Sequence, residues 1–214
     1  MAKFIFIINS AIWLDSKPLS YSKGRTVFSP QQRVEQTLRT ISSIRHYVPN
    51  AKIICLEIGK RRELTGVIEE QADEFYFLGD KKIVRMACDS RFKNLGEALT
   101  FLKGYSFLKN KGDFYFKLSG RYFLNEDFNL LQWDLDKFNM LKTGSVMSTR
   151  LYGFSASLLP LWRRTLLFCL PLLLANRSIE WSMPWFVPKR NINYLQGKIG
   201  VAGNIGPDGS FIQE

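Results

Sequence analysis

One stretch, DFYFKLSGRYFL at positions 113–124, most constrains how this chain folds. Its aromatic residues favour a buried strand, and the Lys111-Gly112 pair before it favours a turn. Gly120 breaks the run, and a glycine inside a strand pattern marks a bend or a close approach to the backbone. Arg121 follows with a planar set of donors that suits phosphate. We predict a buried strand ending at Ser119-Gly120-Arg121, where an anion binds or where Arg121 pairs with a surface carboxylate.

The length, charge and cysteine content limit the organisation of the chain and its partners. Its 214 residues suffice for one α/β domain. The net charge of +11 favours a nucleic acid, an anionic membrane or a phosphorylated small molecule. The three cysteines are far apart and form no Cys-x-x-Cys pair, so we expect a reducing, cytoplasmic environment. Only a short apolar run follows Lys3, so we expect no secretion signal.

Apolar runs alternate with amphipathic segments, the pattern of an α/β fold with a mostly parallel sheet flanked by helices. We expect strands at 4–8, 52–57, 74–78 and 145–150, and helices at 30–46, 60–71 and from 93 onward. In such sheets ligands bind beyond the carboxyl ends of the strands. Asn9, Ser10 and Glu57 therefore become candidate ligand contacts. A plain turn explains Asn9 and Ser10 as well, and a role in the first turn of the next helix explains Glu57.

Two further segments carry candidate phosphate contacts. Residues 13–28 have no helical period and form a basic loop that contains Arg25. Lys93 and Asn94 precede a helix whose first N–H groups lack helical partners, which suits an anion. Capping of that helix by Asn94 is the simpler alternative.

This order of parts resembles the nucleotide-diphospho-sugar transferase fold called GT-A. In that fold the strand after this helix ends in an Asp-x-Asp motif, which holds a divalent metal and the diphosphate of the donor. Ser119-Gly120-Arg121 stands at that place here. The run KLSGRY at 117–122 also resembles a Lys-x-Ser/Thr-Gly-Arg-Tyr signature of glycosyltransferases for bacterial polysaccharides or for capsid glycans of large viruses. The resemblance covers residues 1–205 and implies one GT-A-like, Rossmann-like domain, followed by a tail or linker at 206–214.

The resemblance implies a glycosyltransferase with a UDP- or GDP-sugar as donor and a glycan as acceptor. Because the Asp-x-Asp carboxylates are missing, Arg121 is expected to neutralise the diphosphate, helped by Arg25, Arg91 or Lys93. Ser119 and Gly120 are expected to contact the donor with it. Such an enzyme depends less on a metal than its relatives do.

A metal and a catalytic base complete the expected site. Asp80 and Asp89, on another loop, remain candidate ligands for Mn²⁺ or Mg²⁺, which prefer carboxylate oxygens. By its position, Glu180 resembles the base that deprotonates the acceptor hydroxyl in inverting members of the superfamily. Pairing with Arg177 or capping of a helix is the alternative role for Glu180.

The most apolar segment is 158–174, and aromatic residues surround it. Its ten-residue apolar run at 165–174 is shorter than the roughly 20 residues that span a bilayer. The flanking residues Arg163, Arg164 and Arg177, with Trp162 and Trp181 nearby, are compatible with an interfacial helix on anionic lipid; a buried helix kinked at Pro171 is the alternative. Four aromatic residues are candidates for stacking on sugar rings: Tyr152, Phe154, Trp181 and Trp185.

Two other functions are compatible with these features. A non-catalytic binding domain with the same fold would keep the strands without turnover. A nucleic-acid-binding module would explain the net charge. However, the basic residues are dispersed and no zinc pattern or aromatic RNA-binding motif is present, so we expect no nucleic-acid partner.

Overall fold

The computed structural model of the chain describes residues 2–214 except 16, 21 and 93. Its strands are β1 (Phe4–Ser10), β2 (Lys52–Glu57), β3 (Glu74–Phe77), β4 (Phe114–Ser119), β5 (Tyr122–Leu124), β6 (Phe138–Thr143), β7 (Val146–Ser155), β8 (Ile192–Leu195), β9 (Val201–Asn204) and β10 (Phe211–Gln213). Its α-helices are α1 (Pro30–Tyr47), α2 (Gly66–Gln71), α3 (Lys82–Asp89), α4 (Leu95–Leu108), α5 (Leu159–Leu174) and α6 (Ile179–Phe186). Three short 3₁₀ helices are η1 (Leu130–Gln132), η2 (Ala156–Leu158) and η3 (Lys189–Asn191).

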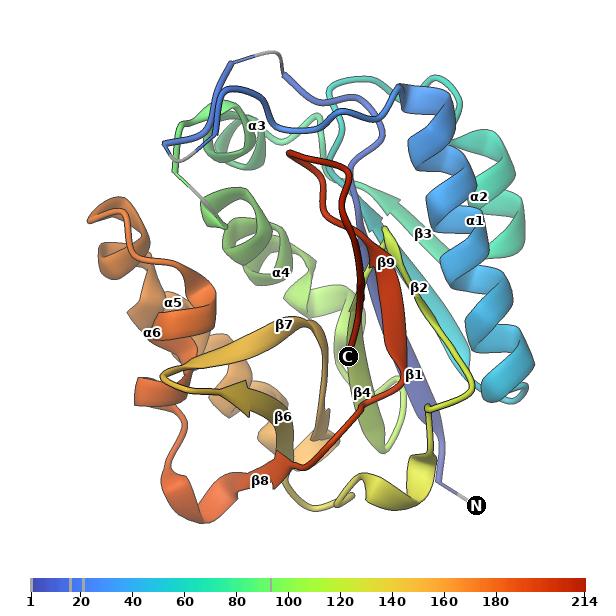
Figure 1. The fold of residues 1–214 in the computed structure, drawn as a ribbon, viewed down its shortest axis with the longest axis vertical. Coiled ribbons are helices and arrows are strands. Elements are labelled where there is room, and N and C mark those ends of the chain that lie inside the picture. The colour runs from blue at the N-terminus through green and yellow to red at the C-terminus, as the bar shows by residue number, and fades with distance from the viewer. Residues whose placement is uncertain (1, 16, 21, 93) are drawn as a thin grey trace.

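The central sheet has seven strands in the order β3-β2-β1-β4-β7-β6-β8 (Figure 1). The strands from β3 to β4 are parallel, as are β6 and β8, whereas β7 is antiparallel to both of its neighbours. A separate antiparallel sheet contains β10, β9 and β5. The predicted α/β fold with a mostly parallel central sheet is therefore confirmed.

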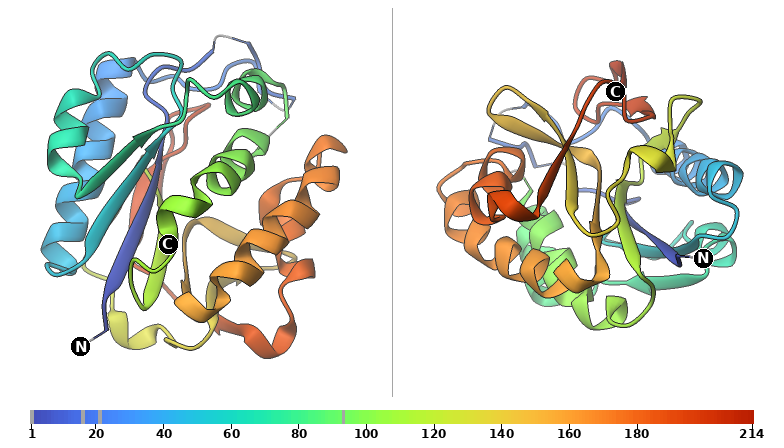
Figure 2. Two further views of the ribbon diagram at one scale, coloured as in Figure 1. Left: turned by 180° about the vertical axis from the view of Figure 1, so that it is seen from behind. Right: turned by 90° about the horizontal axis from the view of Figure 1, so that it is seen from below.

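Two layers cover the central sheet (Figure 2). Successive side chains of a strand point to opposite faces. Phe6 and Ile8 of β1 accordingly pack with α1 and the small sheet, while Ile5 and Ile7 pack with α3, α4 and α5. The continuous apolar runs of β1 and β4 are explained by this burial on both faces. All three cysteines are free and buried in the two cores.

The site lies where the order of the strands reverses. The chain passes from β1 to β2 on one side and later returns to β4 on the other side of β1. Such a reversal opens a crevice at the carboxyl ends of the two strands that flank it. The register aligns Asn9 of β1 with Ser119 of β4, and the rings of Phe6 and Phe116 stack at 4.6 Å beneath them.

Helix α1 fixes the segment 120–124 that follows β4. Thr37, Thr40 and Ser43 recur every three residues and share one face of the helix. Their hydroxyls bond to the backbone of that segment: Thr37 donates to the Gly120 carbonyl at 3.1 Å, Thr40 donates to the Tyr122 carbonyl at 2.7 Å, and Ser43 accepts from the Leu124 N–H at 2.9 Å. A Cβ at Gly120 would lie only 3.2 Å from both the Asn9 carbonyl and Thr37 Oγ1. Glycine is therefore favoured at position 120 because β1 and α1 approach the backbone closely there.

The helix predicted at 60–71 is wrong in its first half. Only Gly66–Gln71 is helical. Lys60 instead pairs with Asp15 at 2.6 Å, and its N–H donates to the carbonyl of Trp13. Leu64 then adopts a positive φ of 69°, which lies outside the α-helical region. A regular helix therefore cannot include this residue. Contacts with the distant loop therefore override the local helical pattern.

Two other segments differ from the predictions. The strand predicted at 145–150 continues to Ser155 and pairs with both β4 and β6. Residues 206–214, predicted as a tail or linker, form a turn and strand β10, which pairs with β9. The N–H of Val27 donates to the Gly206 carbonyl at 2.9 Å, which holds the turn against the basic loop.

Helix α5 has features of both structures expected for the apolar segment, an interfacial helix and a buried helix. Among the described residues, Ala156–Leu174 is the one helical stretch long and apolar enough to cross a membrane by length and composition. Its inner face supplies the core with four fully buried side chains, Trp162, Leu166, Cys169 and Leu173. Trp162, predicted to flank an interfacial helix, donates to the hydroxyl of Tyr152 at 3.0 Å instead. Pro171 lies inside the helix.

Glu74 ties together one edge of the sheet. Its carboxylate pairs with Lys52 at 2.5 Å and with Lys111 at 2.7 Å, and it accepts a hydrogen bond from the Tyr76 hydroxyl at 2.5 Å. Burial opposes ionisation, but the two lysines and the hydroxyl lower the pKa of Glu74 to about 2.

We expect Glu74→Gln to destabilise the protein in a pH-dependent way. A carboxylate with a lowered pKa contributes stability above its unfolded pKa of about 4.3, and this stability is lost as the pH falls through the folded pKa of about 2. The variant should lose about 1–2 kcal/mol of unfolding free energy at pH 7 and much less near pH 2. Urea denaturation at both pH values measures this, and a difference independent of pH would contradict the assignment.

Candidate functional site

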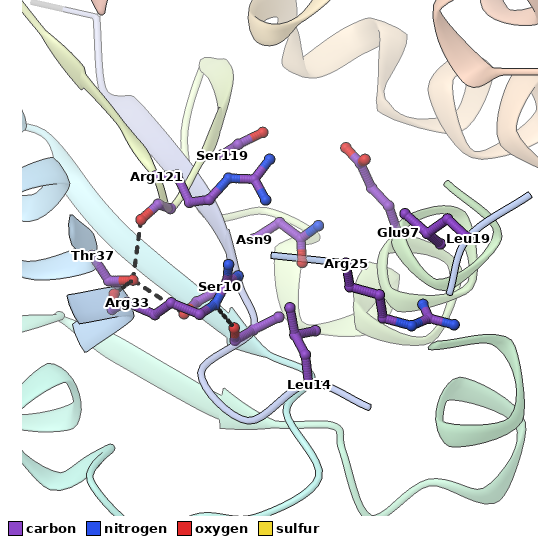
Figure 3. Close-up of a pocket in the computed structure, with 12 residues that line it drawn as sticks. Asn9, Ser10, Leu14, Leu19, Arg25, Arg33, Thr37, Glu97, Ser119 and Arg121 are labelled. Carbon is purple, nitrogen blue, oxygen red and sulfur yellow. Dashed lines mark hydrogen bonds between the residues drawn. The ribbon is translucent and has the colours of Figure 1, made fainter. Parts of the chain in front are cut away.

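A cavity of about 190 Å³ opens at the carboxyl ends of β1 and β4. Six of the predicted site residues line it: Asn9, Ser10, Arg25, Ser119, Gly120 and Arg121. Six further residues complete the lining: Ala11, Leu14, Leu19, Arg33, Thr37 and Glu97. We call this the switch-point cavity (Figure 3).

Three arginines surround the switch-point cavity. Arg25 is fixed by the carbonyls of Lys17 and Ser90, to which it donates at 2.8 Å and 2.5 Å. Arg33 donates to the carbonyl of Ala11 from within α1 and is only 6% exposed. Arg121 has a buried Nε atom with no hydrogen-bond partner among the described residues. Within the part of the chain that the structure describes, none of the three arginines forms an ion pair with a carboxylate.

These positive charges are poorly compensated. Burial lowers the pKa of Arg33, and the nearby charge of Arg121 lowers it further, against an opposing effect of Glu57. Burial also lowers the pKa of Arg25, although Asp15 and Asp89 offset part of this change. Arginine nevertheless keeps its proton in proteins. The electrostatic potential in the cavity is therefore positive. An anion, and a diphosphate in particular, would neutralise it.

Asn9 and Ser10 present their polar groups differently. The side-chain carbonyl of Asn9 is buried and lines the cavity, and no residue that the structure describes donates a hydrogen bond to it. Its backbone carbonyl accepts from the Gly120 N–H at 3.0 Å, which joins β1 to the turn after β4. The Ser10 hydroxyl lies 3.3 Å from Thr37 Oγ1 and is occupied by the protein. Asn9 is therefore the better placed of the two for a ligand.

Glu57, predicted as a candidate ligand contact, has a structural role instead. Its side chain is fully buried and lies outside the cavity lining. One carboxylate oxygen accepts from the Ile12 N–H at 2.9 Å and from the Gly59 N–H at 2.7 Å. Burial raises the pKa of Glu57, while these hydrogen bonds and one from Ser10 lower it. Glu57 thus holds the loops after β1 and β2 together beneath the cavity.

A buried ion pair forms one wall of the cavity. Lys117 of β4 is fully buried, and its Nζ atom lies 2.6 Å from Oε1 of Glu97 on α4. Lys117 also donates to Ser119 Oγ at 2.7 Å and to the carbonyl of Thr149. The other oxygen of Glu97 accepts from Asn94 at 3.3 Å. The lysine of the KLSGRY run therefore orients Ser119 and pairs with Glu97 in the wall of the cavity.

A second cavity of about 420 Å³ adjoins the first, and we call it the α6 cavity. Glu97, Ser119 and Arg121 line both cavities. Glu180, in the first turn of α6, lines only the α6 cavity and accepts a hydrogen bond from Thr149 Oγ1 at 3.2 Å. The other lining residues are Tyr122, Val146, Met147, Thr149, Arg150, Ser178, Ile205 and Pro207.

The predicted anion site at the start of α4 stays a prediction. Lys93 lies outside the described residues. Asn94 makes no capping hydrogen bond to α4; besides donating to Glu97, it accepts weakly from the N–H of Ile179 at 3.4 Å. Asn94 therefore links α4 to α6. Arg91 is exposed and lines neither cavity.

The predicted metal ligands are placed apart from the cavities. Asp80 is exposed beside Lys81, and Asp89 is held by Arg85 at 2.6 Å. Across the described ranges, no group of three or more His, Cys, Asp or Glu side chains is arranged to hold a metal. Of the described residues that line the two cavities, the carboxylates are Glu97, which is engaged by Lys117 and Asn94, and Glu180. These residues do not fit a protein-held metal, so Asp80 and Asp89 are not retained as ligands.

The four aromatic candidates separate into two groups. Tyr152 and Phe154 belong to the core, with at most 1% exposure, and cannot stack on a ligand. Trp181 and Trp185 of α6 pack together at 5.3 Å, and Trp185 is 69% exposed. Only this pair is accessible.

Comparison with known proteins supports the fold. No protein-family model matches the sequence, and no curated protein matches it. Among solved structures, CTP:phosphocholine cytidylyltransferase from Streptococcus pneumoniae is 12% identical, with a TM-score of 0.52 over 95% of this chain and 94% of its own. The bifunctional IspDF from Campylobacter jejuni is 12% identical, with a TM-score of 0.50, and the match covers 92% of this chain but 50% of that one.

A third solved structure, mannose-1-phosphate geranyltransferase from Thermus thermophilus, is 12% identical with a TM-score of 0.45, over 94% of this chain and 76% of its own. At this level of identity the likeness shows the fold alone, a Rossmann-like domain shared with a cytidylyltransferase. It does not single out the GT-A glycosyltransferases that the sequence resembles.

Proposed function

We propose that this protein transfers a sugar from a nucleotide-diphosphate sugar, a UDP- or GDP-sugar, to a glycan acceptor with inversion at the anomeric carbon. The observation that carries the proposal is the position of Arg121, which lines both cavities. A cation that pairs with no carboxylate of the described residues suits, at that boundary, a leaving diphosphate on one side and an attacking hydroxyl on the other.

The switch-point cavity is the proposed donor site. Arg25, Arg33 and Arg121 surround the diphosphate, and bidentate arginine–phosphate contacts are strong charge-assisted hydrogen bonds. The buried carbonyl of Asn9 offers an acceptor for a hydroxyl or an amino group of the nucleoside. Leu14 and Leu19 add an apolar surface to the same lining.

The α6 cavity is the proposed acceptor site, and Glu180 is the proposed base. Glu180 takes the proton of the acceptor hydroxyl while the oxygen attacks the anomeric carbon from the side opposite the diphosphate. The bond from that carbon to the diphosphate breaks, and Arg121 stabilises the negative charge that leaves. Thr149 orients the Glu180 carboxylate through its hydrogen bond. Glu97 is unsuited to this role because Lys117 and Asn94 engage both of its oxygens.

We expect UDP or GDP to raise the melting temperature of the protein, because an anion in the switch-point cavity neutralises the arginines. Ligand at about 100 times its dissociation constant stabilises by about 2.7 kcal/mol, or about 5–10 °C for a chain of this size. Thermal shift with each nucleoside diphosphate, with and without Mn²⁺, measures this. The matched control is inorganic sulfate at the same ionic strength. Absence of a shift with any nucleoside diphosphate at millimolar concentration would remove the donor site.

Nucleotidyl transfer is the second candidate, and the likeness to a cytidylyltransferase over 95% of the chain favours it. The two reactions differ in their products. A glycosyltransferase consumes the nucleotide sugar and releases a nucleoside diphosphate, whereas a nucleotidyltransferase consumes a nucleoside triphosphate and a phosphorylated substrate and releases pyrophosphate. Separate product assays decide between them. Nucleotide binding without turnover in either assay would favour a non-catalytic binding domain.

A further inference from the structure

Helices α5 and α6 form one outer side of the molecule, away from α1 and α2 (Figures 1 and 2). Four large apolar side chains on these helices are exposed: Leu167 by 42%, Phe168 by 52%, Leu174 by 54% and Trp185 by 69%. The rings of Phe168 and Phe186 lie 5.6 Å apart and connect the two helices. The exposed side chains therefore belong to adjacent elements, and such a grouping marks an interaction surface.

Positive charge accompanies this apolar surface. Arg163, Arg164 and Arg177 are exposed beside it, and the guanidinium of Arg177 lies 5.3 Å from the ring of Trp181. The sequence from 137 to 179 contains six Lys and Arg residues and no Asp or Glu. We call this combination of Leu167, Phe168, Leu174 and Trp185 with the three arginines the α5–α6 face.

We propose that the α5–α6 face docks on an anionic lipid bilayer. Exposed leucine and aromatic side chains flanked by arginines are the composition of helices that lie in a membrane interface. Arginines near a membrane surface are attracted to anionic lipid head groups. The inner face of α5 supplies four fully buried core residues, so the helix lies on the bilayer and does not cross it. This proposal is independent of the activity proposed above.

Sedimentation of the full chain with lipid vesicles tests the proposal. We expect binding to phosphatidylcholine vesicles that contain phosphatidylglycerol, and much weaker binding to pure phosphatidylcholine. Phe168→Ser and Trp185→Ser should each weaken binding by at least about fivefold, because each removes apolar surface that the bilayer would bury. Arg164→Ala should weaken binding about fivefold at low salt, and added salt should reduce the difference.

Matched variants outside the face serve as controls. Leu131 is 92% exposed on η1, and Arg61 is exposed on the loop before α2, so Leu131→Ser and Arg61→Ala should bind vesicles like the wild type. Equal binding to both lipid compositions, no binding, or unchanged binding of Phe168→Ser and Trp185→Ser would overturn the proposal. A dimer in lipid-free solution that Phe168→Ser dissociates would also overturn it, since a second copy would then cover the face.

Discussion

Glu180→Gln is expected to slow sugar transfer by about 10² to 10⁴-fold at saturating donor and acceptor. The amide keeps the shape of the side chain and can still contact Thr149, which donates to Glu180 Oε1 at 3.2 Å. It cannot take a proton from the acceptor hydroxyl, so the loss should appear in kcat. Donor binding should change little, because Glu180 lines the α6 cavity and not the switch-point cavity.

The control for this prediction is a carboxylate that lines neither cavity. Asp80 is exposed beside Lys81, so Asp80→Asn should leave turnover unchanged. Asp89→Asn tests the other carboxylate that the sequence suggested as a metal ligand. Because Asp89 forms an ion pair with Arg85, we expect this variant to lose stability and to keep its turnover. Wild-type turnover in Glu180→Gln, or a collapse of turnover in either control, would place the base elsewhere.

The parallel strands β1 to β4 of the central sheet could be predicted because each contains an apolar run, whereas β6 and β8 were not predicted. The strand predicted at 52–57 matches β2, and the helix predicted from Pro30 ends one residue later than expected, at Tyr47. A short continuous apolar run is typical of a strand that is buried on both faces of a parallel sheet. The polar residues at the ends of β1 and β4 could be placed in one cavity for the same reason, since parallel strands end at the same edge.

Features that depend on contacts between distant elements could not be predicted. Arg33 lies on a helix among other polar residues, and only the fold brings it beside Arg121. Lys117 looks like an outward charge in a strand until Glu97, twenty residues earlier, is seen to pair with it. A weak signal was present, because a lysine within the apolar run 114–118 must be paired if that run is buried.

The contacts of the C-terminal turn could not be predicted from the sequence either. Its glycine-rich sequence predicts a loop, and nothing local indicates what the loop contacts. In the structure Ile205 and Pro207 line the α6 cavity, and a Cβ at Gly206 would lie 2.6 Å from a nitrogen of the Arg121 guanidinium. The segment predicted as a tail therefore packs against Arg121, the residue proposed to stabilise the leaving diphosphate.

The largest effect on donor binding is expected from Arg121→Ala. A hydrogen bond to a charged group contributes about 1.5–3 kcal/mol, so the dissociation constant of UDP or GDP should rise about tenfold or more. Arg121→Lys should recover only part of this loss, because an ammonium group cannot reproduce the planar pair of donors. Isothermal titration of each variant with the nucleoside diphosphate measures both effects.

Arg121→Ala should weaken donor binding without destabilising the free protein, and this combination separates a ligand contact from a structural residue. The charge of Arg121 lowers the pKa of Arg33, which means that the two guanidinium groups repel each other in the free protein. Removing one of them relieves that repulsion, so the melting temperature without ligand should stay unchanged or rise. Arg39 is an exposed arginine on α1 that stacks on Phe123 at 3.5 Å outside both cavities, and Arg39→Ala should leave binding intact. Wild-type donor affinity in Arg121→Ala would show that the diphosphate binds elsewhere.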